Sequence, residues 1–256
     1  MGKLNNKYGW IPDIPDHRDY IYKPTLGAES ILPPMIDLRP NDPSIYDQGQ
    51  LGSCTANAIA AAIEHNLKNQ NKKIFTPSRL FIYYNERVME GTVKYDNGAY
   101  IRDGIKSVNT LGVCHETTWK YDISKFKRKP IKTAFNSALK NKTILYQRIN
   151  QSLYDMKYCL YTGFPIVIGF SVYTSFETNN VATTGIVPMP GTNEQLLGGH
   201  AVLVVGYDEN RQVWICRNSW SDKWGDKGYF YLPYNYLLNS NLSDDFWTIQ
   251  SLSTVK

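Results

Sequence analysis

The sequence is poor in the residues that staple small secreted proteins or bind metals in short motifs. It has four cysteines in 256 residues, and they are widely spaced, at positions 54, 114, 159 and 216. This spacing excludes a disulfide framework and a CxxC metal site. We therefore expect free thiols, no bound metal and a reducing compartment such as the cytoplasm.

Long apolar runs and an excess of one charge are also missing. No segment approaches the roughly 18 apolar residues that cross a bilayer, and the first 20 residues lack the apolar core of a secretory signal. The net charge of +5 is mild and dispersed. We expect neither a membrane nor a nucleic acid as a partner, and we favour a monomer.

The overall composition is that of a folded chain, and the kinds of residue change along its length. Hydrophobic residues make up 42% and charged residues 20%, which is typical of a globular protein. Residues 1–34 are rich in proline, aspartate and tyrosine and predict an extended segment, which we call the N-terminal strap. We expect a mainly helical lobe over residues 35–145 and a mainly β lobe over residues 146–256.

Apolar spacing supports this division. Spacings of three and four predict helices over residues 54–68, 78–89, 100–108 and 153–161. Short runs of β-branched and aromatic residues predict strands over residues 164–170, 201–207, 213–216 and 228–232. Helices followed by strands indicate an α+β fold, with two lobes and a cleft between them.

Cys54 stands where a glycine-rich segment meets the start of a helix. The unpaired N–H groups and the macrodipole at a helix N-terminus favour an anion, so the position predicts a lowered thiol pKa and a nucleophilic thiolate. A free cysteine is also a common small buried residue, so this segment alone leaves both interpretations open.

A nucleophilic cysteine needs a base and a group that orients it. Of the four histidines, His65 lies eleven residues along the same helix, about 16 Å from Cys54 and too far to pair. His200 follows two glycines and opens the most apolar strand, which leaves room for substrate. Asn218 ends the next predicted strand and is a candidate for orienting the imidazole, with Trp220 shielding that bond from water.

These segments together resemble the papain-like cysteine peptidases of the cathepsin type. The matches are Gln48, six residues before the cysteine, Gly52-Ser53-Cys54, Gly199-His200-Ala201-Val202 and Asn218-Ser219-Trp220. The segments Ile101-Arg102-Asp103-Gly104-Ile105 and Gly112-Val113-Cys114 are most similar to bacterial and viral members. The resemblance covers roughly residues 33–250.

The resemblance implies a fold and a set of functional residues. The fold is a two-lobe papain-like fold with a helical left lobe and an antiparallel, barrel-like right lobe. The implied catalytic residues are Cys54, His200 and Asn218, with Gln48 in the oxyanion hole and Trp220 on the primed side. Substrate-binding positions are implied at Asn97, Gly98, Ala99, Gly169, Gly199 and Ala201, and either Asp244 or Asp245 is expected near the base of the main specificity pocket.

Three positions depart from the pattern of the family. Leu51 stands where secreted relatives have a disulfide cysteine, Thr55 replaces an aromatic residue, and Gly199 replaces the aspartate of plant members. None of them removes a member of the triad. They bear on the rate and the pH optimum, whereas the reaction class is unaffected.

The implied activity is that of an endopeptidase on protein or peptide substrates, working through a thioester and without a cofactor. Exopeptidase or isopeptidase activity on the same fold, and a binding protein without turnover, are the alternatives. The strap is too short for the helical pro-region of the family. We expect it to lie along the cleft as an extended inhibitory segment of a zymogen, the alternative being a tail wrapped on the surface.

Overall fold

The computed structural model describes residues 8–25, 27 and 32–254. The helices are α1 (Cys54–Asn69), α2 (Arg79–Met89), α3 (Ile101–Leu111), α4 (Lys132–Ala138), α5 (Leu153–Tyr161), α6 (Asn179–Thr184) and α7 (Tyr234–Leu238). The strands are β1 (Met35–Asp37), β2 (Asn141–Arg148), β3 (Ile166–Tyr173), β4 (Leu196–Asp208), β5 (Val213–Arg217), β6 (Tyr229–Pro233) and β7 (Ser243–Thr254). No helix within these described ranges is long and apolar enough to span a bilayer.

The four helices and four strands that the sequence predicts are confirmed, with ends that differ by a few residues. The strands form one antiparallel sheet in the order β2-β7-β3-β4-β5-β6, and β1 pairs with the far end of β4. The predicted barrel-like lobe is therefore an open sheet, because β2 and β6 stand at its two ends and do not pair in the described part of the chain.

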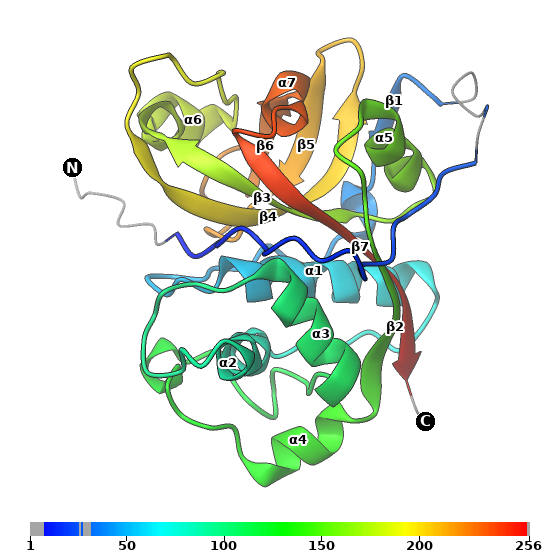
Figure 1. Ribbon diagram of the computed structural model, residues 1–256, viewed down its shortest axis with the longest axis vertical. Coiled ribbons are helices and arrows are strands. Elements are labelled where there is room, and N and C mark those ends of the chain that lie inside the picture. Colours follow the sequence, from blue (N-terminus) through cyan, green and yellow to red (C-terminus); the bar gives the residue numbers. More distant parts are fainter. Residues whose placement is uncertain (1–7, 26, 28–31, 255–256) are drawn as a thin grey trace.

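Helices and strands lie on opposite sides of α1 over most of its length. In Figure 1, α2, α3 and α4 lie below α1, and β3 to β6 with α5, α6 and α7 lie above it, whereas β2 and the end of β7 continue downward beside α3. Helix α1 is buried along nearly its whole length because it packs against α2 and α3 on one side and against β4 and β7 on the other. A helix covered on both sides needs small residues, and its sequence supplies Ala56, Ala58, Ala60, Ala61 and Ala62.

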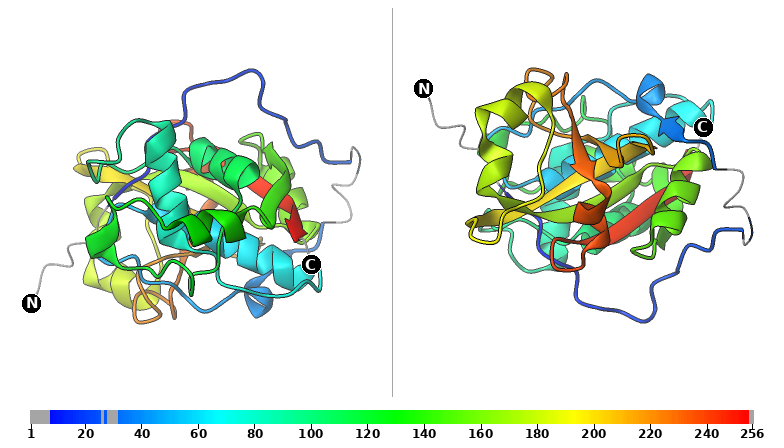
Figure 2. Two further views of the ribbon diagram at one scale, coloured as in Figure 1. Left: turned by 90° about the horizontal axis from the view of Figure 1, so that it is seen from below. Right: turned by 90° about the horizontal axis from the view of Figure 1, so that it is seen from above.

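The described part of the strap is extended, as its prolines predict, apart from a turn at Asp16–Asp19. It passes between α1 and α3 below and β3, β4 and β7 above (Figure 1). It then runs around the outside of the molecule toward α5, where the hydroxyl of Tyr154 donates to the carbonyl of Thr25 (Figure 2). The chain returns as β1 on β4.

Candidate active site

Cys54 is the first residue of α1, and the sulfur lies at the helix N-terminus as the sequence predicts. The side chain is fully buried. The backbone of Ala201, on β4, and that of Gly9, in the strap, lie near the sulfur and favour its thiolate. Burial nevertheless raises the pKa of the Cys54 thiol to about 12. The lowered pKa that the helix N-terminus predicts is not found in this structure, because burial disfavours the charged form of the sulfur.

His200 lies on β4 next to Ala201, whose N–H reaches the sulfur of Cys54. Its Nε2 is 2.9 Å from Oδ1 of Asn218. Its Nδ1 is buried and has no hydrogen-bond partner among the described residues. Burial lowers the pKa of His200 to about 4, and the bond to Asn218 opposes that shift. Burial therefore favours the neutral form of both the thiol and the imidazole.

Trp220 stacks on His200, with ring centroids 4.7 Å apart and an interplanar angle of 27°. The indole is 7% exposed and covers one face of the imidazole. Asn218 is held in turn, because its Oδ1 also accepts the backbone N–H of Ser219 at 2.8 Å. The histidine, its partner and the covering indole thus come from one strand and one turn, as the sequence predicts.

Gln48 lies beside this group, and a neighbour that the sequence did not single out holds it. The hydroxyl of Ser219 donates to Oε1 of Gln48 at 2.6 Å, and the backbone N–H of Gln48 donates to the carbonyl of Ser219 at 2.9 Å. Nε2 of Gln48 donates to the carbonyl of Leu51 at 2.9 Å. Ser219 therefore fixes which end of the amide carries the N–H donors, the end that an oxyanion requires.

The other histidines lie elsewhere. His65 is buried at the far part of α1 with Nδ1 2.8 Å from Asp42, and His115 stacks on Phe75. His17 is exposed in the strap. The exclusion of His65 by distance agrees with these contacts. No group of three His, Cys, Asp or Glu side chains suited to a metal ion occurs in the ranges that the structure describes.

The strap occupies most of the positions that the sequence assigns to substrate. The N–H groups of Gly9 and Trp10 each donate to the carbonyl of Gly199 at 3.0 Å. Ala99 donates its N–H to the carbonyl of Gly9 at 2.8 Å and accepts the N–H of Ile11 at 3.2 Å. Trp10 and Ala99 thereby form a parallel bridge. Asn97, in contrast, is exposed at this turn.

Gly9 passes the nucleophile segment in backbone-to-backbone contact. A Cβ at Gly9 would lie 2.0 Å from the carbonyl oxygen of Gly52, a distance no side chain tolerates. Gly98 adopts φ +83°, and a Cβ there would lie 2.2 Å from the carbonyl oxygen of Gly9. Glycine at these positions lets three backbone segments meet at the cleft.

Trp10 fills the predicted specificity pocket. A Cβ at Gly169 would lie 1.9 Å from the indole, and one at Gly199 would lie 2.8 Å from its Cε3. The indole Nε1 donates to Oδ2 of Asp245 at 2.9 Å. Asp245 is buried, whereas the Asp244 side chain is 50% exposed and pairs with Arg148. Of the two candidate aspartates, Asp245 is the one at the base of the pocket.

Tyr8 covers the side of the cleft where His200 and Trp220 lie. Its ring centroid is 6.2 Å from each of theirs, and its hydroxyl hydrogen-bonds to Glu177. The strap therefore runs from Tyr8, beside the histidine, past the sulfur at Gly9, to the pocket at Trp10. The sequence signal for this path is a glycine, which has no side chain, between two aromatic residues.

Comparisons with known proteins agree with this geometry. A model described as papain family cysteine protease matches residues 32–245. An uncharacterized peptidase C1-like protein, L477, of Acanthamoeba polyphaga mimivirus is 43% identical, over 98% of this chain and 88% of that protein. Cathepsin 7 of Mus musculus is 26% identical, over 79% of this chain and 61% of that protein.

Solved structures of cysteine proteases are also similar to this chain. The crystal structure of xylellain, a cysteine protease from Xylella fastidiosa, is 44% identical, with a TM-score of 0.90 over 100% of this chain and 99% of that chain. Procathepsin L 3 of Tenebrio molitor larval midgut is 17% identical, with a TM-score of 0.72 over 97% of this chain and 77% of that chain. The expected two-lobe fold and the resemblance to bacterial and viral members are confirmed.

Proposed function

Because this chain belongs to the papain family of cysteine proteases, we propose that it cleaves protein or peptide substrates as an endopeptidase with Cys54, His200 and Asn218 as its triad. The observation that supports the triad best is the 2.9 Å bond from His200 to Asn218. That bond leaves Nδ1 of a buried imidazole without another partner in the described structure, next to the strand position that contacts the sulfur of Cys54.

In the proposed reaction His200 takes the proton of the Cys54 thiol, and the sulfur attacks the carbonyl carbon of the scissile bond. The Gln48 amide and the backbone N–H of Cys54 stabilise the oxyanion, each strong donor contributing about 3 kcal/mol in comparable sites. His200 passes its proton to the leaving amine, the C–N bond breaks and a thioester remains. Water then hydrolyses the thioester with His200 as general base.

The direct test replaces the proposed nucleophile in the full chain. Cys54→Ala is expected to abolish hydrolysis of casein and of a blocked fluorogenic dipeptide, because no other thiol lies beside His200 in the described structure. Cys216→Ala is the matched control, since Cys216 is equally buried but lies on β5 away from the cleft. An epoxysuccinyl peptide should label the wild-type chain at Cys54. Turnover that survives Cys54→Ala contradicts the triad.

The pocket that holds Trp10 supports a preference for substrates that carry an N–H donor at the matching position. Asp245 lies at its base and Gly169 and Gly199 line its wall, so an arginine or an aromatic donor fits the space and the charge. This preference stays a prediction. Dipeptide substrates that differ only in arginine or leucine at that position test it in the same assay.

We further propose that the strap inhibits the enzyme. In hydrolysis the leaving amine lies near His200, so the C-terminal half of a substrate occupies the side of the cleft next to His200 and Trp220. Tyr8, the first residue of the strap that the structure describes, lies on that side. The strap therefore runs opposite to a substrate and brings an N–H group, that of Gly9, to the sulfur in place of a carbonyl carbon.

Replacing Gly9 tests the inhibition. Gly9→Ala is expected to expel the strap, because the new Cβ meets the carbonyl oxygen of Gly52, and to raise the initial rate of dipeptide hydrolysis by about tenfold or more. Ile14→Ala is the control in the same segment, since its side chain is 70% exposed. If Gly9→Ala is no faster than the wild-type chain, the strap does not limit access to the site.

A further inference from the structure

Arg102, in the first turn of α3, belongs to a motif that the proposed reaction does not use. Its guanidinium is nearly buried and forms a two-pronged ion pair with Asp19 of the strap, with Nη2–Oδ2 at 2.6 Å and Nε–Oδ1 at 3.0 Å. Nη1 donates to the carbonyl of Ile14 at 2.5 Å, and the backbone N–H of Arg102 donates to Oδ1 of Asp13 at 3.1 Å. One residue of the body therefore holds three residues of the strap.

The contact at Asp13 connects this arginine to the specificity pocket. The Asp13 side chain is fully buried, and its Oδ2 accepts the indole N–H of Trp247 at 2.9 Å. Its backbone N–H donates to Oδ2 of Asp245 at 2.7 Å, the same oxygen that accepts the indole of Trp10. The position of Trp10 in the pocket thus depends on where Asp13 is held, three residues further along the strap.

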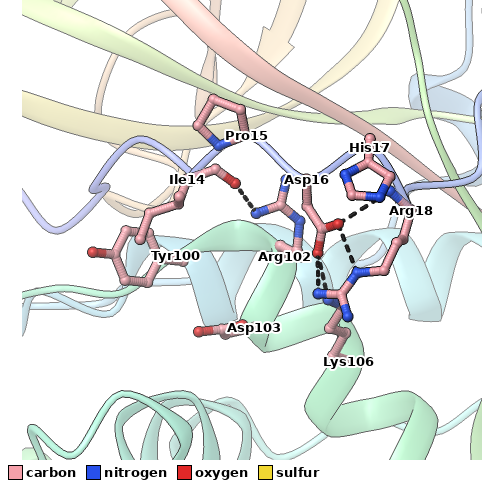
Figure 3. A pocket seen from close by; sticks show the side chains of 9 residues that line it. All are labelled: Ile14, Pro15, Asp16, His17, Arg18, Tyr100, Arg102, Asp103 and Lys106. Carbon is pink, nitrogen blue, oxygen red and sulfur yellow. Dashed lines mark hydrogen bonds and ion pairs between the residues drawn. The ribbon is translucent and has the colours of Figure 1, made fainter.

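Apolar burial contributes little to this part of the strap. The side chains of Ile14 and Tyr20 are 70% and 75% exposed. Between the strap and α3 lies a hollow of about 490 Å³, so the two segments meet mainly through polar atoms. Figure 3 shows the strap arching over this hollow and Arg102 reaching across it to the carbonyl of Ile14.

The turn after Ile14 presents Asp19 to Arg102. The Asp16 carboxylate accepts the backbone N–H and two guanidinium N–H groups of Arg18, and the backbone N–H of Asp19 donates to the carbonyl of Asp16 at 3.1 Å. These bonds lie within the strap and do not attach it to the body. Lys106, one turn further along α3, reaches Asp16 only at 3.9 Å.

We propose that the ion pair of Arg102 with Asp19 is the latch that keeps the N-terminal strap in the cleft, and this inference rests on the proposed inhibition by the strap. The hydrogen bonds and ion pairs of the Arg102 side chain in the described part of the chain are all with strap residues. Arg148 also lies near two of the strap acids, 3.7 Å from Asp13 and 3.9 Å from Asp19, but it pairs with Asp244 and Asp245 as well.

Because these partners of Arg102 lie in the strap, its ion pair and hydrogen bonds stabilise the docked strap and are lost when the strap leaves the cleft. A two-pronged, largely buried pair is among the stronger polar contacts in proteins, and losing one partner leaves the other poorly solvated. Either partner can therefore be removed to open the latch. Because Asp19 belongs to the strap, its replacement leaves α3 and the cleft unchanged.

The test measures strap docking separately from turnover. In a full-length Cys54→Ala background, hydrogen exchange of the amides of Gly9, Trp10, Ile11 and Asp13 reports docking, because these N–H groups bond to the body. Arg102→Ala and Asp19→Asn are each expected to speed this exchange by at least tenfold. The exchange rates in the double variant should be close to those in either single variant, because the two substitutions remove the same contact. Exchange within α3 shows whether Arg102→Ala has disturbed the helix itself.

Lys106→Ala is the matched control on the same helix, and its exchange should equal that of the parent chain. With Cys54 restored, Arg102→Ala and Asp19→Asn are expected to raise the initial rate of dipeptide hydrolysis. Unchanged exchange in both variants overturns the latch. Faster exchange without faster hydrolysis keeps the latch and refutes inhibition by the strap. If Gly9→Ala raises the rate of dipeptide hydrolysis but Arg102→Ala and Asp19→Asn do not, inhibition by the strap stands and the latch is refuted.

Discussion

At the scale of single residues, the protonation of Cys54 depends on what covers it. The helix N-terminus and two backbone N–H groups favour the thiolate, yet burial under the strap raises the pKa of the thiol to about 12. A raised pKa means that the docked state favours the protonated sulfur. Its contribution to docking is therefore complete below the ordinary thiol pKa and is lost as the pH rises toward 12.

Alkylation of Cys54 should reveal this dependence. In the wild-type chain, the rate of reaction with iodoacetamide is expected to be low at pH 7 and to rise by about tenfold per pH unit between pH 8 and 10, following the thiolate fraction. In the Gly9→Ala chain it should already be high at neutral pH. Mass spectrometry of the peptide that contains Cys54 gives both rates. Equal rates at pH 7 would show that the docked strap does not control the thiol.

At the scale of elements, the direction of the strap matters as much as its position. The parallel bridge between Trp10 and Ala99, with Tyr8 beside His200, brings the N–H of Gly9 to the sulfur. A strap that ran the other way would present a carbonyl carbon there and would be a substrate. A protease can thus keep an uncut segment of its own chain in its cleft.

Self-cleavage should respect this direction. When the full chain is incubated, we expect the first cuts to fall in the exposed stretch after Asp13 and none to fall between residues 8 and 13. N-terminal sequencing of the products over time checks the order. A Cys54→Ala chain mixed with a trace of active enzyme serves as the control for cleavage by a second molecule. An early product that begins at Trp10 would contradict the reversed path.

Some elements were predictable from local pattern and others were not. Helix α1 and strand β4 have strong apolar periodicity, so their positions follow from sequence. Strand β7 was missed because it opens with serine and two aspartates, and Asp245 has φ +61°. Its burial comes from neighbours on β2 and β3, which no local pattern contains.

In the candidate site too, some residues could be predicted from local sequence and others could not. Cys54, His200 and Asn218 each stand in a short motif at a helix or strand end, so their roles could be predicted before their distances were known. The choice between Asp244 and Asp245 could not, because it depends on contact with Trp10, 235 residues earlier in the chain. Ser219 was overlooked because its bond to Gln48 joins positions 171 residues apart.

At the scale of the whole molecule, the strap begins and ends on one strand. Near its start, Gly9 and Trp10 bond to Gly199, in the half of β4 that carries His200. After its outer loop, the chain returns as β1 and pairs with the other half, where Met35 lies opposite Asp208. A single element of the sheet therefore anchors both the docked segment of the strap and the point at which the strap joins the enzyme.

This closed loop makes the docked strap a tethered ligand. While the loop is intact, the cleft faces a local strap concentration on the order of millimolar, whatever the dilution of the protein. One cut anywhere in the outer loop leaves β1 on the sheet and turns the docked segment into a short free peptide, whose rebinding then depends on its bulk concentration. On dilution this peptide would dissociate and would not rebind, so a single cut would open the cleft permanently.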